Sequence, residues 1–179
     1  MPKYVAFLRA INVGGTSLLK MDMLKKHFES FGLEKVQTYI QTGNVIFETK
    51  EMGPPKLEKM IDAELEKALG YNIGIFLRTM DDVVSIAEKS PFKPGENETV
   101  HISFLAEKPG TAACKKLTTF NSAADEFLVK GREAYNLRHD REASVFSNQL
   151  IEKVLGVPAT TRNQTTIKKI AEKYGYHQS

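Results

Sequence analysis

Two segments of this chain align with each other without a gap, and this internal repeat restricts its fold more than any other feature. Residues 78–89 align on residues 162–173, so that Arg78 falls on Arg162 and both segments close on Ile-Ala-Glu-Lys. Identities within one helix can arise by coincidence, because amphipathic helices draw on few residue types. The order of the elements before each segment also matches, and an internal duplication is the better explanation.

The first half of the chain predicts one β-α-β-β-α-β unit followed by a further helix. Apolar residues at helical spacing, closed by Gly32 and Gly70, indicate the two helices within the unit. Thr42 and Gly43 form a turn between two runs rich in β-branched and aromatic residues, as in a hairpin. The expected elements are a strand over 3–8, a helix over 21–31, strands within 35–49, a helix over 54–69, a strand over 72–78 and a helix over 79–90.

The second half repeats this order after a linker at about residues 91–98, which is rich in proline, glycine and polar residues. The expected elements are a strand over 99–107, a helix over 111–120, a hairpin over 126–138 that turns at Gly131-Arg132, a helix within 141–156 with Phe146, Leu150 and Val154 on one face, and a short strand over 159–161. The predicted fold class is α+β, a tandem duplication of a ferredoxin-like unit with antiparallel sheets and helices on one face. The expected subdomains are 1–92 and 98–179.

The composition places the chain among ordinary globular proteins. Its 179 residues are 41% hydrophobic and 26% charged, enough to form a core, and no apolar run approaches the length of a membrane span. No small-residue cleavage site follows the first apolar run, so no signal peptide is expected. Cys114 is the only cysteine, which excludes an intrachain disulfide and suits the cytoplasm. A net charge of +3 permits a polyanionic partner but is also common among enzymes.

The duplicated topology predicts a polar edge in the first unit. The first and second strands of such a unit run in the same direction, so the end of the first strand lies beside the hairpin between the second and third. In this chain the polar and glycine residues expected there are Arg9, Asn12, Gly14, Gly15, Gln41 and Asn44. Successive glycine N–H groups can bind an anion, and an adjacent arginine can hold a carboxylate or phosphate.

A purely structural interpretation of the same residues remains open. Gly14 and Gly15 can serve only to turn the chain, since no complete phosphate-loop or dinucleotide motif surrounds them. The hairpin residues can serve only the hairpin, and Arg9 can extend from a strand end into solvent.

Arg162 and Asn163 form a second candidate binding site. Asn163 aligns with Thr79, which starts a Thr-x-x-Asp capping pattern, so Asn163 is expected to cap the last helix. Arg162 is a cation close to a helix N-terminus, where the helix dipole disfavours it unless an anion lies nearby. Arg78 occupies the corresponding position, which favours a structural salt bridge in both repeats.

No catalytic, metal-binding or cofactor-binding residues can be assigned from the sequence. The four histidines lack partners at metal-ligand spacing, and no Cys-x-x-Cys or Gly-x-Ser-x-Gly motif is present. Cys114 lies in an apolar helix, where it is expected to pack rather than react. His139 and Asp140 are adjacent, and a loop that leads into a helix explains them better than an acid–base pair does.

Three ordered motifs, Phe-Leu-Arg-Ala-Ile-Asn-Val-Gly-Gly at 7–15, Thr-Tyr-Ile-Gln-Thr-Gly-Asn-Val-Ile-Phe at 38–47 and Ala-Thr-Thr-Arg-Asn-Gln-Thr-Thr at 159–166, carry a family resemblance. The chain resembles the conserved bacterial family DUF1697, a domain of unknown function. The resemblance covers essentially the whole chain and implies two ferredoxin-like α+β subdomains. It implies no activity, ligand or catalytic residue. The chain has Gln164 where members of the family usually have tryptophan, so no aromatic stacking surface is expected there.

Three functions are compatible with the sequence. The first is a binding module for a phosphate-bearing or other anionic ligand, including single-stranded RNA, whose bases would stack on aromatic residues of the strands (Tyr4, Phe7, Tyr39 and Phe47). The second is an enzyme that acts on a small anionic substrate at the polar edge of the first unit. The third is an assembly protein that pairs through open sheet edges. The sequence leaves the oligomeric state open.

Overall fold

The computed structural model describes residues 1–9, 20–39, 43–50 and 52–175. The chain forms two compact units, one made of Met1–Ser85 with Ile170–Ser179 and the other of Ile86–Lys169. The first unit is therefore discontinuous in sequence, and the second lies between its two parts along the chain. None of the described helices is both long and apolar enough to span a membrane.

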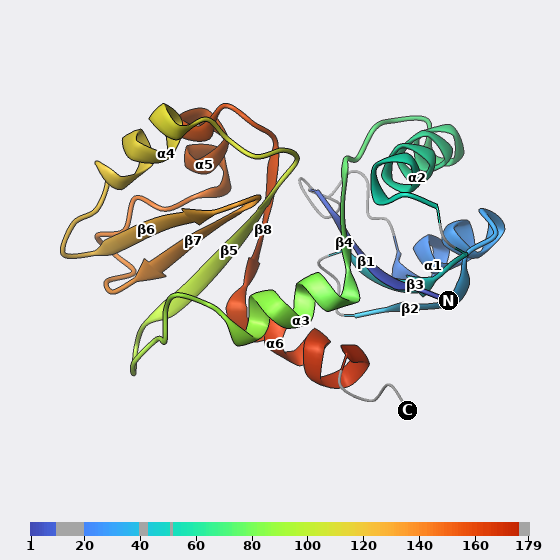
Figure 1. Ribbon diagram of the computed structural model, residues 1–179, viewed down its shortest axis with the longest axis horizontal. Coiled ribbons are helices and arrows are strands. Elements are labelled where there is room, and N and C mark those ends of the chain that lie inside the picture. Colours follow the sequence, from blue (N-terminus) through green and yellow to red (C-terminus); the bar gives the residue numbers. More distant parts are fainter. Residues whose placement is uncertain (10–19, 40–42, 51, 176–179) are drawn as a thin grey trace. The chain divides into compact units, whose positions relative to one another are not determined.

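The first unit has the β-α-β-β-α-β order that the sequence predicts. Its four-stranded sheet has the antiparallel order β2-β3-β1-β4, and α1 and α2 lie against one face of it (Figure 1). The elements are β1 (Lys3–Leu8), α1 (Met21–Ser30), β2 (Glu34–Thr38), β3 (Asn44–Glu48), α2 (Pro54–Leu69), β4 (Ile75–Thr79) and α3 (Met80–Glu88), and the last three residues of α3 belong to the second unit.

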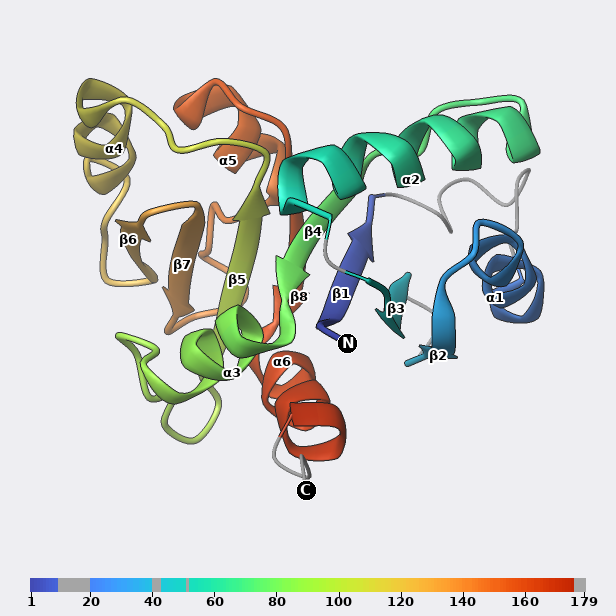
Figure 2. The same cartoon turned by 45° about the vertical axis from the view of Figure 1, so that its right-hand side comes forward.

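The second unit repeats this topology strand for strand. Its sheet has the order β6-β7-β5-β8, and α4 and α5 lie side by side on one face of it (Figure 2). The elements are β5 (Thr99–Leu105), α4 (Thr111–Thr118), β6 (Asp125–Lys130), β7 (Glu133–Arg138), α5 (Asn148–Leu155), β8 (Ala159–Asn163) and α6 (Gln164–Ile170). Ile170 and the π-helical turn that follows it, at Ala171–Gly175, belong to the first unit. The fold is a duplicated ferredoxin-like α+β unit, as predicted.

The strand–helix joints confirm the repeat on which the prediction was based. β4 and β8 occupy corresponding positions of the aligned segments, and each is followed directly by a helix. Thr79 Oγ1 accepts a hydrogen bond from the N–H of Asp82 at 3.0 Å, and Asn163 Oδ1 accepts one from Thr165 at 2.9 Å. Both residues are the expected N-caps. The short strand expected at 159–161 is present and extends to Asn163.

The core of the first unit forms between its sheet and the helices α1 and α2. Leu57, Ile61 and Leu65 recur on one face of α2 and are fully or almost fully buried, together with Phe47 of β3 and Phe28 of α1. The opposite face of the same sheet is also apolar and buried, as at Val5, Phe7, Ile46 and Phe76. Strands that are buried on both faces lack alternation of apolar and polar residues, which explains the near-continuous apolar runs in the sequence.

The face of α5 differs from the prediction. The helix starts at Asn148, with Ser147 as its N-cap, so Phe146 lies before the helix rather than on its apolar stripe. The buried positions are Ile151, Val154 and Leu155. Helical spacing continues by chance into the preceding loop, where only the serine marks the true start.

Residues of the C-terminal segment belong to the first unit. The rings of Tyr39 and Tyr174 meet edge to face with centroids 6.2 Å apart, and Lys173 Nζ lies within 6 Å of both rings, at 5.8 and 5.5 Å. Lys3 Nζ donates to the Tyr174 carbonyl at 2.9 Å. The C-terminal segment therefore adds an aromatic partner and a cation for Tyr39 and a hydrogen-bond acceptor for Lys3 to the first unit.

Side chains cap parts of the outer strands of both sheets. The N–H of Leu77 in β4 donates to Glu58 of α2 at 2.8 Å, and the N–H of Ala159 in β8 donates to Glu152 of α5 at 2.9 Å. The N–H of Phe127 in the edge strand β6 donates to Asn121 at 2.8 Å. The remaining edge strand, β2, shifts register next to Lys35, whose φ is +49°. Such caps and bulges make an edge a poorer template for a further strand.

Candidate functional site

The end of β1 meets the β2–β3 hairpin at one edge of the first sheet, as the topology predicts. Phe7 is in register with Asn44, and the N–H of Leu8 donates to the Gly43 carbonyl at 2.8 Å. The N–H of Arg9 donates to Gly74 at 3.1 Å, so the turn before β4 joins the same edge. Four of the residues predicted for a ligand site here, Asn12, Gly14, Gly15 and Gln41, lie outside the described residues.

Asn44 serves the hairpin. Its side chain is fully buried, and its Nδ2 donates to the Tyr39 carbonyl at 2.9 Å. The N–H of Tyr39 in turn donates to the Asn44 carbonyl at 3.0 Å. These two contacts close the base of the hairpin, so the observed contribution of Asn44 to this edge is structural.

Replacing Asn44 with alanine is expected to lower the free energy of unfolding of the first unit by about 2 kcal/mol, because the Tyr39 carbonyl loses its buried donor. Asn44→Asp is the matched variant, since it keeps the size of the side chain but cannot donate. Chemical denaturation of both variants measures the effect. Two variants with wild-type stability would show that the hairpin does not need this donor.

The second predicted site, Arg162 with Asn163, is divided between a buried and an exposed residue. Arg162 lies within β8, one residue before the N-cap of α6, and is only 7% exposed; Arg78 corresponds to it in β4 and is 2% exposed. Arg162 donates to Thr160 Oγ1 and to the Thr161 carbonyl, both at 2.9 Å, and Arg78 donates to the Leu77 carbonyl at 2.9 Å. Burial lowers the pKa of Arg162 to about 10. The salt bridge expected for both arginines stays a prediction.

Gln164 begins α6 and is buried. Its Oε1 accepts a hydrogen bond from Ser90 Oγ, and its Nε2 donates to the Phe92 carbonyl at 3.3 Å. The Gln164 amide therefore holds residues 90–92 against the start of α6.

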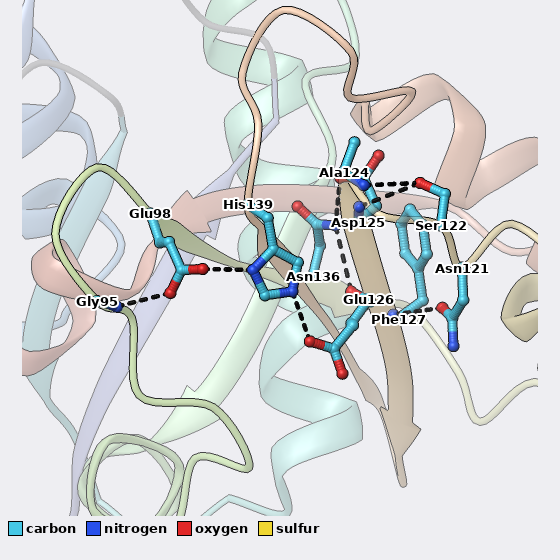
Figure 3. Close-up of polar contacts among 10 residues, drawn as sticks. All are labelled: Gly95, Glu98, Asn121, Ser122, Ala124, Asp125, Glu126, Phe127, Asn136 and His139. Carbon is cyan, nitrogen blue, oxygen red and sulfur yellow. Dashed lines mark hydrogen bonds and ion pairs between the residues drawn. The ribbon is translucent and has the colours of Figure 1, made fainter.

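A polar network that the sequence did not reveal lies inside the second unit, and we call it the Asp125 network; Figure 3 shows two of its members, Asp125 and Asn136. Asp125 is fully buried at the start of β6, and its carboxylate accepts from Asn136 Nδ2 at 3.0 Å, from Ser144 Oγ at 2.7 Å and from the N–H of Val145 at 2.8 Å. Asn136 Oδ1 faces His101 Nδ1 at 3.2 Å. The network thus connects three strands, β6, β7 and β5, with the loop before α5.

His139 lies between two carboxylates, next to this network but paired separately (Figure 3). Its Nδ1 contacts Glu98 Oε2, and its Nε2 contacts Glu126 Oε2 at 2.6 Å. The second oxygen of Glu98 accepts from the N–H of Gly95 at 2.8 Å, which ties the loop before β5 to the end of β7. Hydrogen bonds to Glu98 and then Glu126 raise the pKa of His139 above its usual 6.5.

This arrangement predicts a window of pH in which the loop is most firmly held. The bond to the Gly95 N–H, followed by that to His139, lowers the pKa of Glu98 below its usual 4.5, so its contribution is complete above pH 4.5 and is lost as pH falls through the lowered value. The contribution of His139 is complete below pH 6.5 and is lost as pH rises through its raised pKa. The difference in melting temperature between wild type and His139→Gln should be largest between these limits. A difference that is constant from pH 4 to 9 would contradict the ion pairing.

Only part of the Asp125 network, and none of the pairing of His139 with the two glutamates, could be predicted from the sequence. A hairpin turning at Gly131-Arg132 fixes the register of β6 and β7, which brings Asn136 opposite Phe127 and next to Asp125. The pairing of Glu98 with His139 depends on loop conformations that no local pattern records. Within the described residues, no group of three or more histidine, cysteine or acidic side chains is arranged to hold a metal ion.

The sequence profile of a family described as "Protein of unknown function (DUF1697)" matches residues 1–135. The chain belongs to this family. A solved structure similar to it is that of a conserved bacterial protein from Streptococcus pneumoniae, with a TM-score of 0.70, 21% identity and coverage of 96% of this chain and 97% of that one. This likeness shows that this DUF1697 chain shares its fold with the protein from Streptococcus pneumoniae. No curated protein matches the chain.

Proposed function

We propose that this protein of the DUF1697 family binds a small anionic ligand, through a phosphate or carboxylate group, at the edge of the first unit around Arg9. The convergence of three segments on Arg9 supports this assignment: the end of β1 carries it, the hairpin at Gly43 adjoins it, and the turn at Gly74 accepts its N–H. Described residues of two segments that carry the family resemblance, 7–9 and 43–47, lie at this edge. Sites that use loops at the ends of strands combine a rigid scaffold with open backbone.

Arg9 is the described group best suited to recognise an anion here. A guanidinium offers paired N–H donors that match the oxygens of a carboxylate or phosphate. Its side chain is partly exposed, in contrast to the buried Asn44. The ligand role proposed for this edge therefore rests on Arg9, while Asn44 maintains the hairpin beside it.

The proposal favours a small molecule over single-stranded RNA. RNA-binding sheets of this topology stack bases on exposed aromatic side chains. Tyr4, Phe7 and Phe47 are at most 3% exposed, and Tyr4 stacks on Phe47 inside the core with centroids 5.7 Å apart. Three of the four aromatic residues considered for stacking are thus unavailable. A bacterial, cytoplasmic setting belongs to the same proposal; the single cysteine supports the cytoplasm, and the similar structure from Streptococcus pneumoniae supports a bacterial source.

A thermal-shift screen tests the proposal with pyrophosphate, citrate, sugar phosphates and a short single-stranded RNA, each at low and moderate salt. A ligand at a hundred times its Kd adds about 2.7 kcal/mol, which moves the melting temperature of a chain this size by roughly 5 to 10 °C. Arg9→Ala should abolish the shift and Arg9→Lys should weaken it. Lys25→Ala, which removes an exposed charge from α1, is the matched control and should keep it.

An equal shift in wild type and Arg9→Ala would place the ligand elsewhere and overturn the proposal. A shift with RNA alone, strongest at low salt, would instead favour a nucleic-acid-binding module.

A further inference from the structure

We propose that the second unit carries an independent binding site for a small anion that also bears a hydroxyl group, with His101 Nε2 accepting a hydrogen bond from the hydroxyl, Arg138 attracting the anion and Asn163 donating a hydrogen bond. The three residues come from adjacent strands, β5, β7 and β8. The site lies in the second unit and shares no residue with the edge around Arg9, which is in the first unit.

The tautomer of His101 follows from the Asp125 network. Asn136 Nδ2 faces Asp125 Oδ1 at 3.0 Å and the Glu126 carbonyl at 3.3 Å, and both of these atoms only accept hydrogen bonds. The amide oxygen of Asn136 must therefore be the atom that faces His101 Nδ1. Because an amide oxygen only accepts, Nδ1 carries the proton of the neutral ring, and Nε2 keeps a lone pair.

The imidazole is held in place and kept neutral. Its ring stacks on Phe146, with centroids 4.6 Å apart and an angle of 16° between the planes. Burial is the main cause that lowers the pKa of His101 below 6.5; Arg138 acts in the same direction, and Asn136 and Asp125 oppose it. At neutral pH the ring is thus an oriented acceptor. Within the described part of the chain, the Nδ1 contact with Asn136 is its one recorded hydrogen bond.

Sheet register places two polar residues beside this acceptor. Asn163 of β8 is directly opposite His101, so their side chains share one face of the sheet. Arg138 of β7 lies two residues beyond Asn136, which is opposite His101 on the other side, and is thus a diagonal neighbour on the same face. Asn163 is exposed, and His101 and Arg138 are partly exposed.

These neighbours retain unused donors. Asn163 employs Oδ1 to cap α6, and its Nδ2 has no recorded partner among the residues that the structure describes. The guanidinium of Arg138 likewise has no recorded ion pair or hydrogen bond to a described residue. A cation, an amide donor and a neutral imidazole acceptor together match a hydroxycarboxylate or a protonated phosphate, since such ligands offer both a negative charge and an O–H group.

Nuclear magnetic resonance of the full chain tests the first step without a ligand. Long-range ¹H–¹⁵N spectra of the histidine side chains at pH 7.5 should show His101 with a protonated Nδ1 and an unprotonated Nε2. The opposite tautomer would overturn the proposal, because Nε2 would then be a donor.

Titration with L-lactate tests the ligand class, and propionate, which lacks the hydroxyl, is the matched compound. Lactate should shift the His101 Nε2 resonance with at least a several-fold higher affinity than propionate. The surface variants Arg138→Gln and Asn163→Ala should weaken the effect of lactate about tenfold or more, the loss expected when a bond to a charged group is removed. Arg9→Ala should leave it unchanged, so that failure of this site and failure of the site around Arg9 can be told apart. Equal shifts from both compounds, no shift of His101, or wild-type affinity in Arg138→Gln would overturn the proposal.

Discussion

Replacing Asp125 with alanine is expected to lower the free energy of unfolding of the second unit by about 3 to 5 kcal/mol, the range found when one partner of a buried charged network is removed. The carboxylate is fully buried and accepts three hydrogen bonds, from Asn136, Ser144 and the N–H of Val145. Its loss leaves these donors unpaired in the interior. Urea denaturation, followed by probes in the second unit, measures the change.

Asp125→Asn is the control for this variant. It keeps the volume and one acceptor oxygen but removes the negative charge, so it should cost less than alanine does. A loss below about 1 kcal/mol in Asp125→Ala would mean that the network is dispensable, because a typical single hydrogen bond contributes that much. The loop at 144–146 should lose hydrogen-exchange protection first, since the carboxylate holds it directly.

Ile61→Ala and Ile151→Ala form a pair that tests the two units separately. Each isoleucine is fully buried on the helix that packs against its own sheet, α2 in the first unit and α5 in the second. Truncation of a buried isoleucine costs about 2 to 5 kcal/mol through lost burial and the cavity left behind. Residue-resolved hydrogen exchange should show Ile61→Ala weakening protection in β1–β4 and Ile151→Ala weakening it in β5–β8.

Lys67→Ala, which changes an exposed side chain of α2, provides the baseline and should alter neither unit. If either isoleucine variant lowered protection equally in both sheets, the units would unfold as one cooperative body. The boundaries after residues 85 and 169 would then separate two compact regions that do not unfold independently of each other.

The elements that sequence predicts well are those with a local physical cause. Gly70 and Gly156 end their helices with φ of +84° and +72°, a conformation that glycine adopts at low cost, and both ends were predicted from those residues. The strand at 159–161 has almost no signal of its own and was predicted only because the repeat requires it. The internal repeat therefore predicts an element that the local pattern of apolar and polar residues does not reveal.

The polar clusters of the second unit show where that information stops. Asn136 and Asp125 look like ordinary strand and turn residues, and their importance emerges only when the hairpin register and burial are combined. Phe146 was placed on a helix face because its spacing fitted, although it stacks on His101 from a loop. The sequence offers Asp140 as the neighbour of His139, yet the partners of His139 are Glu98 and Glu126, which come from other segments.

The discontinuous first unit has a consequence for synthesis. A ribosome makes the chain from its N-terminus, so residues 1–85 emerge first and the contiguous second unit emerges next, at rates of about 5 to 20 residues per second. Tyr174 and Lys173, which contact Tyr39, are translated after both sheets. The oldest part of the nascent protein therefore acquires these contacts only after the second unit has been made, and the Tyr39–Tyr174 pair can form only once translation has passed residue 174.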